Sequence, residues 1–387
     1  MSLRPTGPRD AVIVEAVRTP IGRRNGRYAN THAVRLGASA LRGLLDRAQF
    51  PDDQLDDIIA GCVTVVGEQA RNIGRNVALL AGVPDEVPAT TVDRQCGSSQ
   101  QAIHFAAALI ESGADDVIAC FGVEAMSRIP LGTHVANGPG DPHEELRPRR
   151  GLVVQGIGAR MIADEYGIDR AELDRFSVES HRKAAAATQR GDFRGELVPV
   201  SGVENGVPGD DEGIRPDTSM EKLATLKPAF EENGSITAGN SSQISDGAAA
   251  VLLMSRERAE AEGRRPRARI AAHTVVGVDP VTMLKGPIPA TRRLLQRSGV
   301  SLNDVALFEV NEAFASVPLA WLRDLDADPA VLNVLGGAIA LGHPVGSTGA
   351  RLTTTLLNEM ERRNVQFGVV AMCCGGGLGT AMLVERN

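Results

Sequence analysis

The sequence predicts an α/β protein made of two related halves, each a mixed sheet with covering helices. Apolar strand-like segments alternate with helical ones, which is typical of βαβ units. Apolar residues make up 43% of the chain but aromatic residues only 3%, and 42 of the 387 residues are Gly. A core of small and aliphatic side chains suits close helix–sheet packing. A chain of this length is expected to form two or three domains.

The first half begins with the apolar run A-V-I-V-E-A-V, which predicts a buried strand. Gly82 and Pro84 mark the end of the second predicted helix. In chain order the expected elements are strand 11–17, helix 31–48, a strand within 55–63, helix 71–81, strand 88–93, helix 97–112 and a strand from 116.

The middle of the chain has a different composition. Residues 130–150 and 199–220 are rich in Pro, Gly and charge, with helices expected at 156–167 and 170–190. The run G-A-A-A-V-L-L-M-S predicts a further core strand, and the α/β series resumes from Arg267. We therefore expect one half from 1–117 plus 245–266, a loop domain at 118–244, and a second half at 267–387.

The second half repeats the first. Asn311 follows Thr64 by 247 residues, and His343 follows Cys96 by the same number. Two matches at one spacing indicate an internal duplication, with Cys96 and His343 at equivalent positions. Pseudo-twofold packing would bring both helix-opening turns to one central site.

Cys96 is the candidate nucleophile. It lies in V-D-R-Q-C-G-S-S-Q-Q-A, a polar turn before a helix, although a buried core thiol is the usual fate of Cys. A helix N-terminus and a nearby imidazole lower a thiol pKa, so we expect Cys96 to be held as thiolate. Cys62 and Cys120 end apolar strands and are interpreted as core residues.

Three further residues complete the expected chemistry. His343, between Gly342 and Pro344, is either a fixed imidazole or a helix N-cap. Asn311 follows a strand and either caps the next helix or positions water or an oxyanion. Cys373, in C-C-G-G-G-L-G, is the candidate second acid/base, while the glycines bring backbone N–H groups to an oxyanion.

Composition excludes several functions. The net charge of −7 without a basic block argues against nucleic-acid binding. Five cysteines and no signal-like N-terminus indicate a reducing bacterial cytoplasm, and no apolar run is long enough for a membrane span. No CxxC, HxH or HExxH spacing occurs, so we expect no metal and no permanently bound cofactor.

These motifs resemble the thiolase family: D-R-Q-C-G-S-S-Q-Q-A, then N-E-A-F, G-H-P and C-x-G, over essentially the whole chain. The resemblance implies a layered α/β/α/β/α fold, with Cys96 as the acyl-accepting nucleophile and His343 as its base. It also implies a water held by Asn311, Cys373 as the second acid/base, and an oxyanion hole from the N–H groups of Cys96 and Gly375.

The resemblance further implies coenzyme A and acyl-CoA as substrates. Ser242 in T-A-G-N-S-S-Q-I-S-D-G would contact coenzyme A, and Arg215 would lie near its nucleotide end. A homodimer or homotetramer is expected. Asp93 and Gly97 depart from the family pattern, and G-I-G at 156–158 replaces the H-M-G of short-chain members. The loss of larger side chains there predicts a wider acyl pocket and a bulkier 3-ketoacyl-CoA.

Three alternatives remain. A short-chain acetoacetyl-CoA thiolase would share the same chemistry. A ketosynthase of the same fold would use Cys with two His residues and an N-x-H-G-T motif, which the sequence lacks. A non-catalytic acyl-CoA or sterol carrier would not need Cys96, His343 and Cys373 together.

Overall fold

The strands lie in one mixed sheet that both halves of the chain share. A computed structural model describes residues 3, 5–136 and 143–386. The strand order is β4-β3-β5-β6-β1-β7-β10-β9-β8, with β2 paired to β6 beside this path. The strands are β1 (Ala11–Arg18), β2 (Gly22–Arg23), β3 (Asp57–Gly61), β4 (Ala89–Val92), β5 (Val117–Ala125), β6 (Ser245–Ser255), β7 (Ala268–Gly277), β8 (Leu307–Val310), β9 (Phe367–Cys374) and β10 (Leu378–Glu385).

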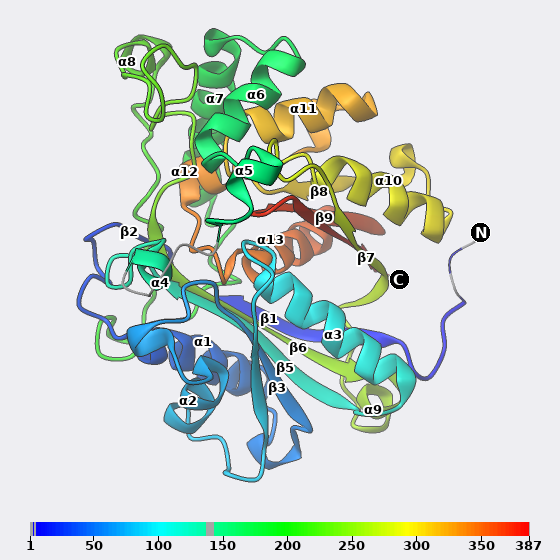
Figure 1. Cartoon of the computed structure of the whole chain (residues 1–387). Coiled ribbons are helices and arrows are strands. Elements are labelled where there is room, and N and C mark those ends of the chain that lie inside the picture. The colour runs from blue at the N-terminus through cyan, green and yellow to red at the C-terminus, as the bar shows by residue number, and fades with distance from the viewer. Residues whose placement is uncertain (1–2, 4, 137–142, 387) are drawn as a thin grey trace.

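Helices cover both outer faces and fill the space between the halves (Figure 1). The α-helices are α1 (Ala33–Ala48), α2 (Ile73–Leu80), α3 (Ser98–Ser112), α4 (Thr133–Ala136), α5 (Arg147–Arg150), α6 (Gln155–Glu165), α7 (Arg170–Arg190), α8 (Met220–Ala224), α9 (Arg256–Ala261), α10 (Pro287–Ser298), α11 (Ser316–Leu325), α12 (Ala338–Leu341) and α13 (Thr348–Arg363). Short 3₁₀ turns lie at Asp52–Gln54, Gly67–Gln69, Leu302–Asp304 and Pro329–Val331.

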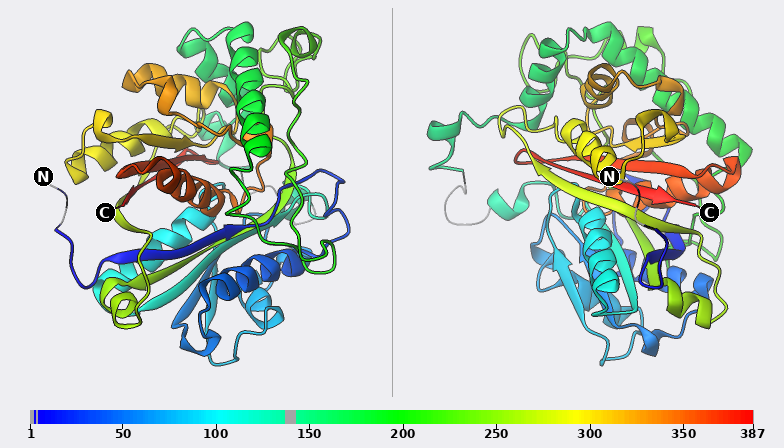
Figure 2. Two further views of the ribbon diagram at one scale, coloured as in Figure 1. Left: turned by 180° about the vertical axis from the view of Figure 1, so that it is seen from behind. Right: turned by 90° about the vertical axis from the view of Figure 1, so that its right-hand side faces the viewer.

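The two halves of the sheet form separate layers because only a short stretch joins them. Between β1 and β7 the paired residues are Val12 with Arg269 and Ile13 with Ala268. Helices α3 and α13 pack against strands on both sides, while α1 and α2 cover the N-terminal strands and α10 covers the C-terminal ones (Figures 1 and 2). The α/β/α/β/α arrangement expected from the resemblance is confirmed.

The duplication is visible in the topology. In the first half β3 runs parallel to β5, and β6 pairs antiparallel with β5 and β1. In the second half β8 runs parallel to β9, and β10 pairs antiparallel with β9 and β7. The starts of β3 and β8, of α3 and α13, and of β5 and β9 all differ by 250 residues (57 and 307, 98 and 348, 117 and 367).

The expected equivalence of Cys96 and His343 is wrong by three residues. At the structural offset of 250, Cys96 corresponds to Gly346, and His343 lies three residues earlier. The two helix-opening turns do meet in the centre: the Ala350 N–H donates to Ser99 Oγ at 2.9 Å. Similar turns therefore approach each other, but they present their functional side chains from different positions.

The expected boundary at residue 117 cuts through a core strand. Val117–Ala125 forms β5, which pairs with β3 on one side and β6 on the other. The loop-rich part therefore starts after Ala125 and reaches Ser245, where β6 begins. Its main helices, α6 and α7, pack beside α11 and α12 of the second half. Residues 137–142 of the predicted loop segment 130–150 lie outside the described residues.

A buried ion cluster ties the loop region to β1. Arg18 is fully buried; its Nε donates to Glu196 at 2.5 Å, and its two Nη atoms donate to Asp211 at 2.7 and 2.9 Å. Asp211 also accepts the Ile21 N–H at 2.7 Å. Two carboxylates around one guanidinium satisfy the donors that burial would otherwise leave without water.

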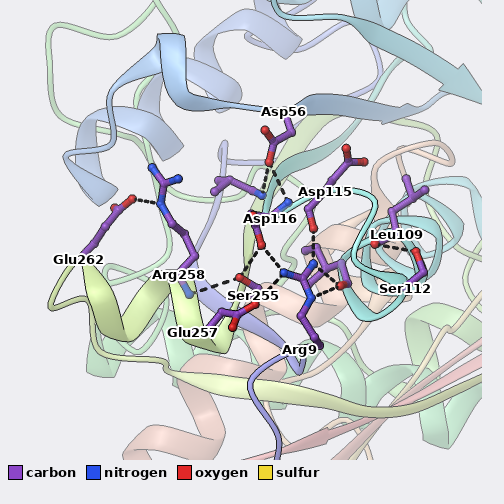
Figure 3. Close-up of polar contacts among 12 residues, drawn as sticks. Arg9, Asp56, Leu109, Ser112, Asp115, Asp116, Ser255, Glu257, Arg258 and Glu262 are labelled. Atoms are coloured by element: carbon purple, nitrogen blue, oxygen red, sulfur yellow. Dashed lines mark hydrogen bonds and ion pairs between the residues drawn. The ribbon is translucent and has the colours of Figure 1, made fainter.

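A second polar cluster closes the opposite end of the N-terminal strands (Figure 3). Arg9 contacts Asp116 and donates to Glu257 at 2.9 Å, while Ser255 Oγ donates to Asp116 at 2.8 Å. Asp56 accepts the Asp116 N–H at 2.8 Å. These contacts fix the start of β5 against the end of β6, away from the end at which β4 leads to Cys96.

Candidate active site

The nucleophile turn is built by its own polar residues. Gln95 has a φ of 50°, a left-handed backbone conformation that residues other than glycine rarely adopt. Asp93 Oδ1 accepts the Gln95 N–H at 2.7 Å, and Ser98 Oγ accepts the Arg94 N–H at 2.9 Å. This tight turn between β4 and α3 directs Cys96 inward at the helix N-terminus, while its polar residues Asp93, Arg94 and Gln95 stay exposed or half-buried.

The Cys96 thiol is protonated in the resting protein. Burial raises its pKa to about 11, while the N–H groups of Gly375 and of Cys96 itself act in the opposite direction and nearby Glu124 raises it further. The expected lowering of this pKa is therefore wrong for the resting state, because desolvation outweighs the donors. The two N–H groups nevertheless point at the sulfur, where an oxyanion hole was expected.

His343 has a defined tautomer. Thr348 Oγ1 donates to the Pro344 carbonyl at 2.9 Å and lies 2.6 Å from His343 Nδ1. Its oxygen therefore accepts a hydrogen bond from Nδ1–H, which leaves Nε2 unprotonated and able to accept from Asn311 Nδ2. Burial, aided by the charge of Arg351, lowers the pKa of His343 to about 3. The imidazole is thus neutral and can act as a base.

Asn311 connects His343 with Cys373. Its Nδ2 lies 3.3 Å from His343 Nε2, and its Oδ1 is buried with no hydrogen-bond partner among the described residues. The Asn311 side chain and the Ala313 N–H also contact the Cys373 thiol, whose pKa burial raises despite both. Asn311 sits at this junction because β8 and β9 pair up to Val310 and Ala371.

The two adjacent cysteines have different neighbours. Cys373 contacts Asn311 and therefore lies on the side of His343. The Cys374 thiol instead receives the Gly97 N–H, and a Cβ built on Gly97 would lie 2.7 Å from its Sγ. Gly97, which departs from the family pattern, thus makes room for Cys374 behind the nucleophile turn.

Two glutamines that border the site were not predicted from the sequence. A Cβ on Gly375 would lie 2.9 Å from Gln155 Nε2 and 3.1 Å from Gln95 Oε1, so both side chains border the glycine that faces Cys96. The position of Gln95 beside Cys96 was a usable signal, whereas nothing in the sequence links Gln155 to this turn. Thr348, five residues after His343, was also missed.

A buried carboxylate holds the loops behind the site. Glu124, near the end of β5, accepts N–H groups of Val63 at 3.0 Å, Thr64 at 2.9 Å and Gly346 at 3.0 Å. Gly346 belongs to the turn between His343 and Thr348. Glu124 therefore connects the N-terminal sheet to the turn that carries the base.

Ser242 and Arg215, the two residues expected to bind coenzyme A, lie in different surroundings. The Ser242 N–H donates to the Ala313 carbonyl at 2.9 Å, which places it next to the residue that contacts Cys373. Arg215 is exposed, and its N–H donates to His181 Nδ1 at 3.1 Å. The backbone of Ser242 thus lies beside the segment that follows β8, whereas Arg215 lies on the surface of the loop region.

The expected opening of the acyl pocket at 156–158 is not found. A Cβ on Gly156 would lie 2.5 Å from Phe230 Cδ1 and nearer still to two other ring carbons. A Cβ on Gly158 would lie 3.0 Å from the Val281 carbonyl oxygen. The space that the two glycines free is filled, at Gly156 by an aromatic ring and at Gly158 by backbone.

Within the described residues, no group of three or more His, Cys, Asp or Glu side chains could hold a metal ion. Over the same residues, no helix has both the length and the apolar character to cross a membrane.

Family comparisons agree with this geometry. Residues 11–257 match the family model described as "Thiolase, N-terminal domain", and residues 264–386 match "Thiolase, C-terminal domain". The boundary between them falls in the chain between the end of β6 and the start of β7, at the transition from the first half to the second.

Known proteins similar to this chain carry related names. A steroid 3-ketoacyl-CoA thiolase of Mycobacterium tuberculosis is 47% identical over 386 residues, covering 97% of this chain and 94% of the relative. A 3-ketoacyl-CoA thiolase of Escherichia fergusonii is 48% identical over 387 residues, covering 97% and 99%. The crystal structure of the Bacillus anthracis acetyl-CoA acetyltransferase matches with a TM-score of 0.89 and 39% identity, covering 97% of this chain and 98% of that one.

Proposed function

Because this chain belongs to the thiolase family and is an acyltransferase, we propose that it cleaves a 3-ketoacyl-CoA with coenzyme A through a Cys96 acyl-enzyme. The observation that carries the proposal is the pair of N–H groups, from Cys96 and Gly375, that point at one thiol. Donors fixed around a sulfur at a helix N-terminus suit a tetrahedral oxyanion formed there.

In the first half-reaction, the Cys96 sulfur attacks the keto carbon and its proton passes to His343 Nε2. Because burial keeps the resting thiol protonated and the imidazole neutral, we propose that the proton moves only as the sulfur attacks. The bond between the α and β carbons then breaks, and the electron pair leaves as the enolate of acetyl-CoA. Cys373 donates its thiol proton to that enolate.

The second half-reaction restores every proton. The thiol of incoming coenzyme A gives its proton to the Cys373 thiolate and attacks the acyl-enzyme carbonyl. Cys96 leaves as the acyl-CoA product forms, and it recovers its proton from His343. The unpartnered Asn311 Oδ1 supports a water beside His343 that stabilises the enolate oxygen, because a buried acceptor needs a donor.

Coenzyme A and acyl-CoA are thus substrates, and no permanently bound cofactor is invoked. We propose that Ser242 contacts the pantetheine, which its contact with Ala313 supports, and that exposed Arg215 binds the nucleotide end. A surface Arg contact contributes about 1 kcal/mol. Arg215→Ala should therefore raise KM a few-fold with kcat nearly unchanged. The expected homodimer or homotetramer stays a prediction.

The names of the relatives favour a 3-ketoacyl-CoA longer or bulkier than acetoacetyl-CoA. The relatives with 47–48% identity are named 3-ketoacyl-CoA thiolases, one of them a steroid 3-ketoacyl-CoA thiolase, whereas the 39% identical structure is named an acetyl-CoA acetyltransferase. A specialised acetoacetyl-CoA thiolase is the second candidate, and a panel of acyl chains would separate the two.

The test is peptide mass spectrometry after incubation with a 3-ketoacyl-CoA in the absence of free coenzyme A. One acyl group should appear on the peptide that contains Cys96, and none in Cys96→Ala. Cys373→Ser should take the label more slowly, because the enolate lacks its proton donor, and should lose turnover by roughly 10²–10⁴. Cys374→Ser is the matched control and should stay active. A label that persists in Cys96→Ala would refute the mechanism.

A further inference from the structure

Phe230 has an unusual position for an aromatic side chain. Its ring fills the space that the missing side chain of Gly156 leaves, yet 42% of the residue is exposed. Gly156 itself is buried in the first turn of α6. The ring thus covers a glycine from the solvent side and is not enclosed in the core.

The ring also lies between two walls of the active site. On one side, Gly156 follows Gln155, whose amide borders Gly375 next to the Cys96 thiol. On the other side, the Phe230 ring packs edge-on against Phe314, with centroids 5.9 Å apart and planes at 72°.

Phe314 in turn adjoins the second cysteine, because it directly follows Ala313, whose N–H contacts Cys373. Phe230 therefore stands between the element that borders the nucleophile and the element that borders the acid/base.

These contacts hold the Phe230 ring in place only weakly. An edge contact with one ring and a face contact with a glycine restrain the ring weakly, since 42% of the residue is exposed. If the ring turned outward, a space of about its own size would open beside Gln155, because Gly156 has no Cβ to fill it. A branched or alicyclic acyl group is apolar and of similar size.

We infer that Phe230 is a specificity-determining residue, and that the ring or branch of a bulky 3-ketoacyl-CoA occupies the space where the Phe230 ring now contacts Gly156. This inference rests on the proposed function. A short linear acyl group does not need that space. Phe230 and Gly156 should therefore control the ratio of kcat/KM between bulky and short substrates, while the chemical step itself does not depend on them.

The experiment compares two substrates: acetoacetyl-CoA, and a 3-ketoacyl-CoA with a cyclohexyl group on its keto carbon. Phe230→Ala should raise kcat/KM for the cyclohexyl substrate, relative to acetoacetyl-CoA, by roughly tenfold. Gly156→Ala places a methyl group in the same space and should lower that ratio several-fold. Phe105→Ala is the matched control, since Phe105 has the same side chain and is 43% exposed on α3; its ratio should not change.

The outcomes separate the two proposals. An equal rise in KM for both substrates in Phe230→Ala would mean that the ring contacts the shared coenzyme A part, and would overturn the inference. An unchanged ratio in folded Phe230→Ala, with an active wild type, would overturn it as well. If Phe230→Ala does not fold, Phe230→Leu replaces it with the same direction expected. A wild type that cleaves neither substrate and takes no acyl label on Cys96 would instead refute the proposed function.

Discussion

Alkylation of Cys96 as a function of pH tests the resting state of the nucleophile. With a pKa of about 11, roughly one thiol in 10⁴ is ionised at pH 7, against one in 10² for an ordinary thiol with a pKa of 9.0. Because only the thiolate reacts with iodoacetamide, the alkylation rate in the absence of substrate should rise about tenfold per pH unit from 7 to 10. Timed peptide mass spectrometry of the Cys96 peptide measures that rate.

The matched variant is His343→Asn. A neutral imidazole with a pKa of about 3 does not stabilise a resting thiolate, so this variant should keep the same pH profile while it loses turnover. The raised pKa of Cys96 also sets how stability depends on pH, because the folded protein holds the Cys96 thiol proton more tightly than the unfolded chain does. The thiol's contribution is therefore complete below pH 9 and is lost as pH rises toward 11. A rate that levels off below pH 8 in the wild type would refute a protonated resting thiol.

Three substitutions test other contacts of the structure. Gly97→Ser places a side chain against the Cys374 sulfur and should lower the free energy of unfolding in urea by about 1–3 kcal/mol; the double variant with Cys374→Ala should recover part of it, and full additivity would contradict the contact. Arg18→Met leaves two buried carboxylates without their partner and should cost about 3–5 kcal/mol by the same measurement, whereas a loss below 1 kcal/mol would mean that water reaches them. Thr348→Val removes the acceptor for His343 Nδ1–H and should lower kcat about 5- to 30-fold, with a loss of about 1–3 kcal/mol in the free energy of unfolding; an unaltered kcat would show that the tautomer is held otherwise.

Local signals in the sequence were sufficient for most of the fold. Helix 97–112 is α3 (Ser98–Ser112), and the strand at 247–255 is the main part of β6 (Ser245–Ser255). The duplication was also detectable, but its offset was not. The elements of the two halves keep one offset of 250, but Asn311 and His343 each lie three residues before the positions equivalent to Thr64 and Cys96, so matching by residue type gave 247.

The site was predictable where its residues belong to contiguous motifs. Cys96, His343, Asn311 and Cys373 each lie in such a motif; Asn311 connects His343 with Cys373, and Cys96 lies near enough to Cys373 for their charges to interact. The pKa of Cys96 was not predictable, because the direction of the shift depends on burial by distant segments. The acyl pocket was not predictable either: the ring that fills the space at Gly156 comes from Phe230, 74 positions later in the chain.

The place of β6 in the sheet has a consequence for synthesis on the ribosome. This strand lies between β5 and β1, yet it follows β5 by more than a hundred residues of loop region. Until Ser255 has left the ribosome, the nascent N-terminal half has the facing edges of two strands without their partner. Such edges invite pairing with other chains, and contacts between distant segments form slowly. The translation of residues 126–244 is therefore the interval in which this protein most needs a chaperone, and a pause there should increase its aggregation.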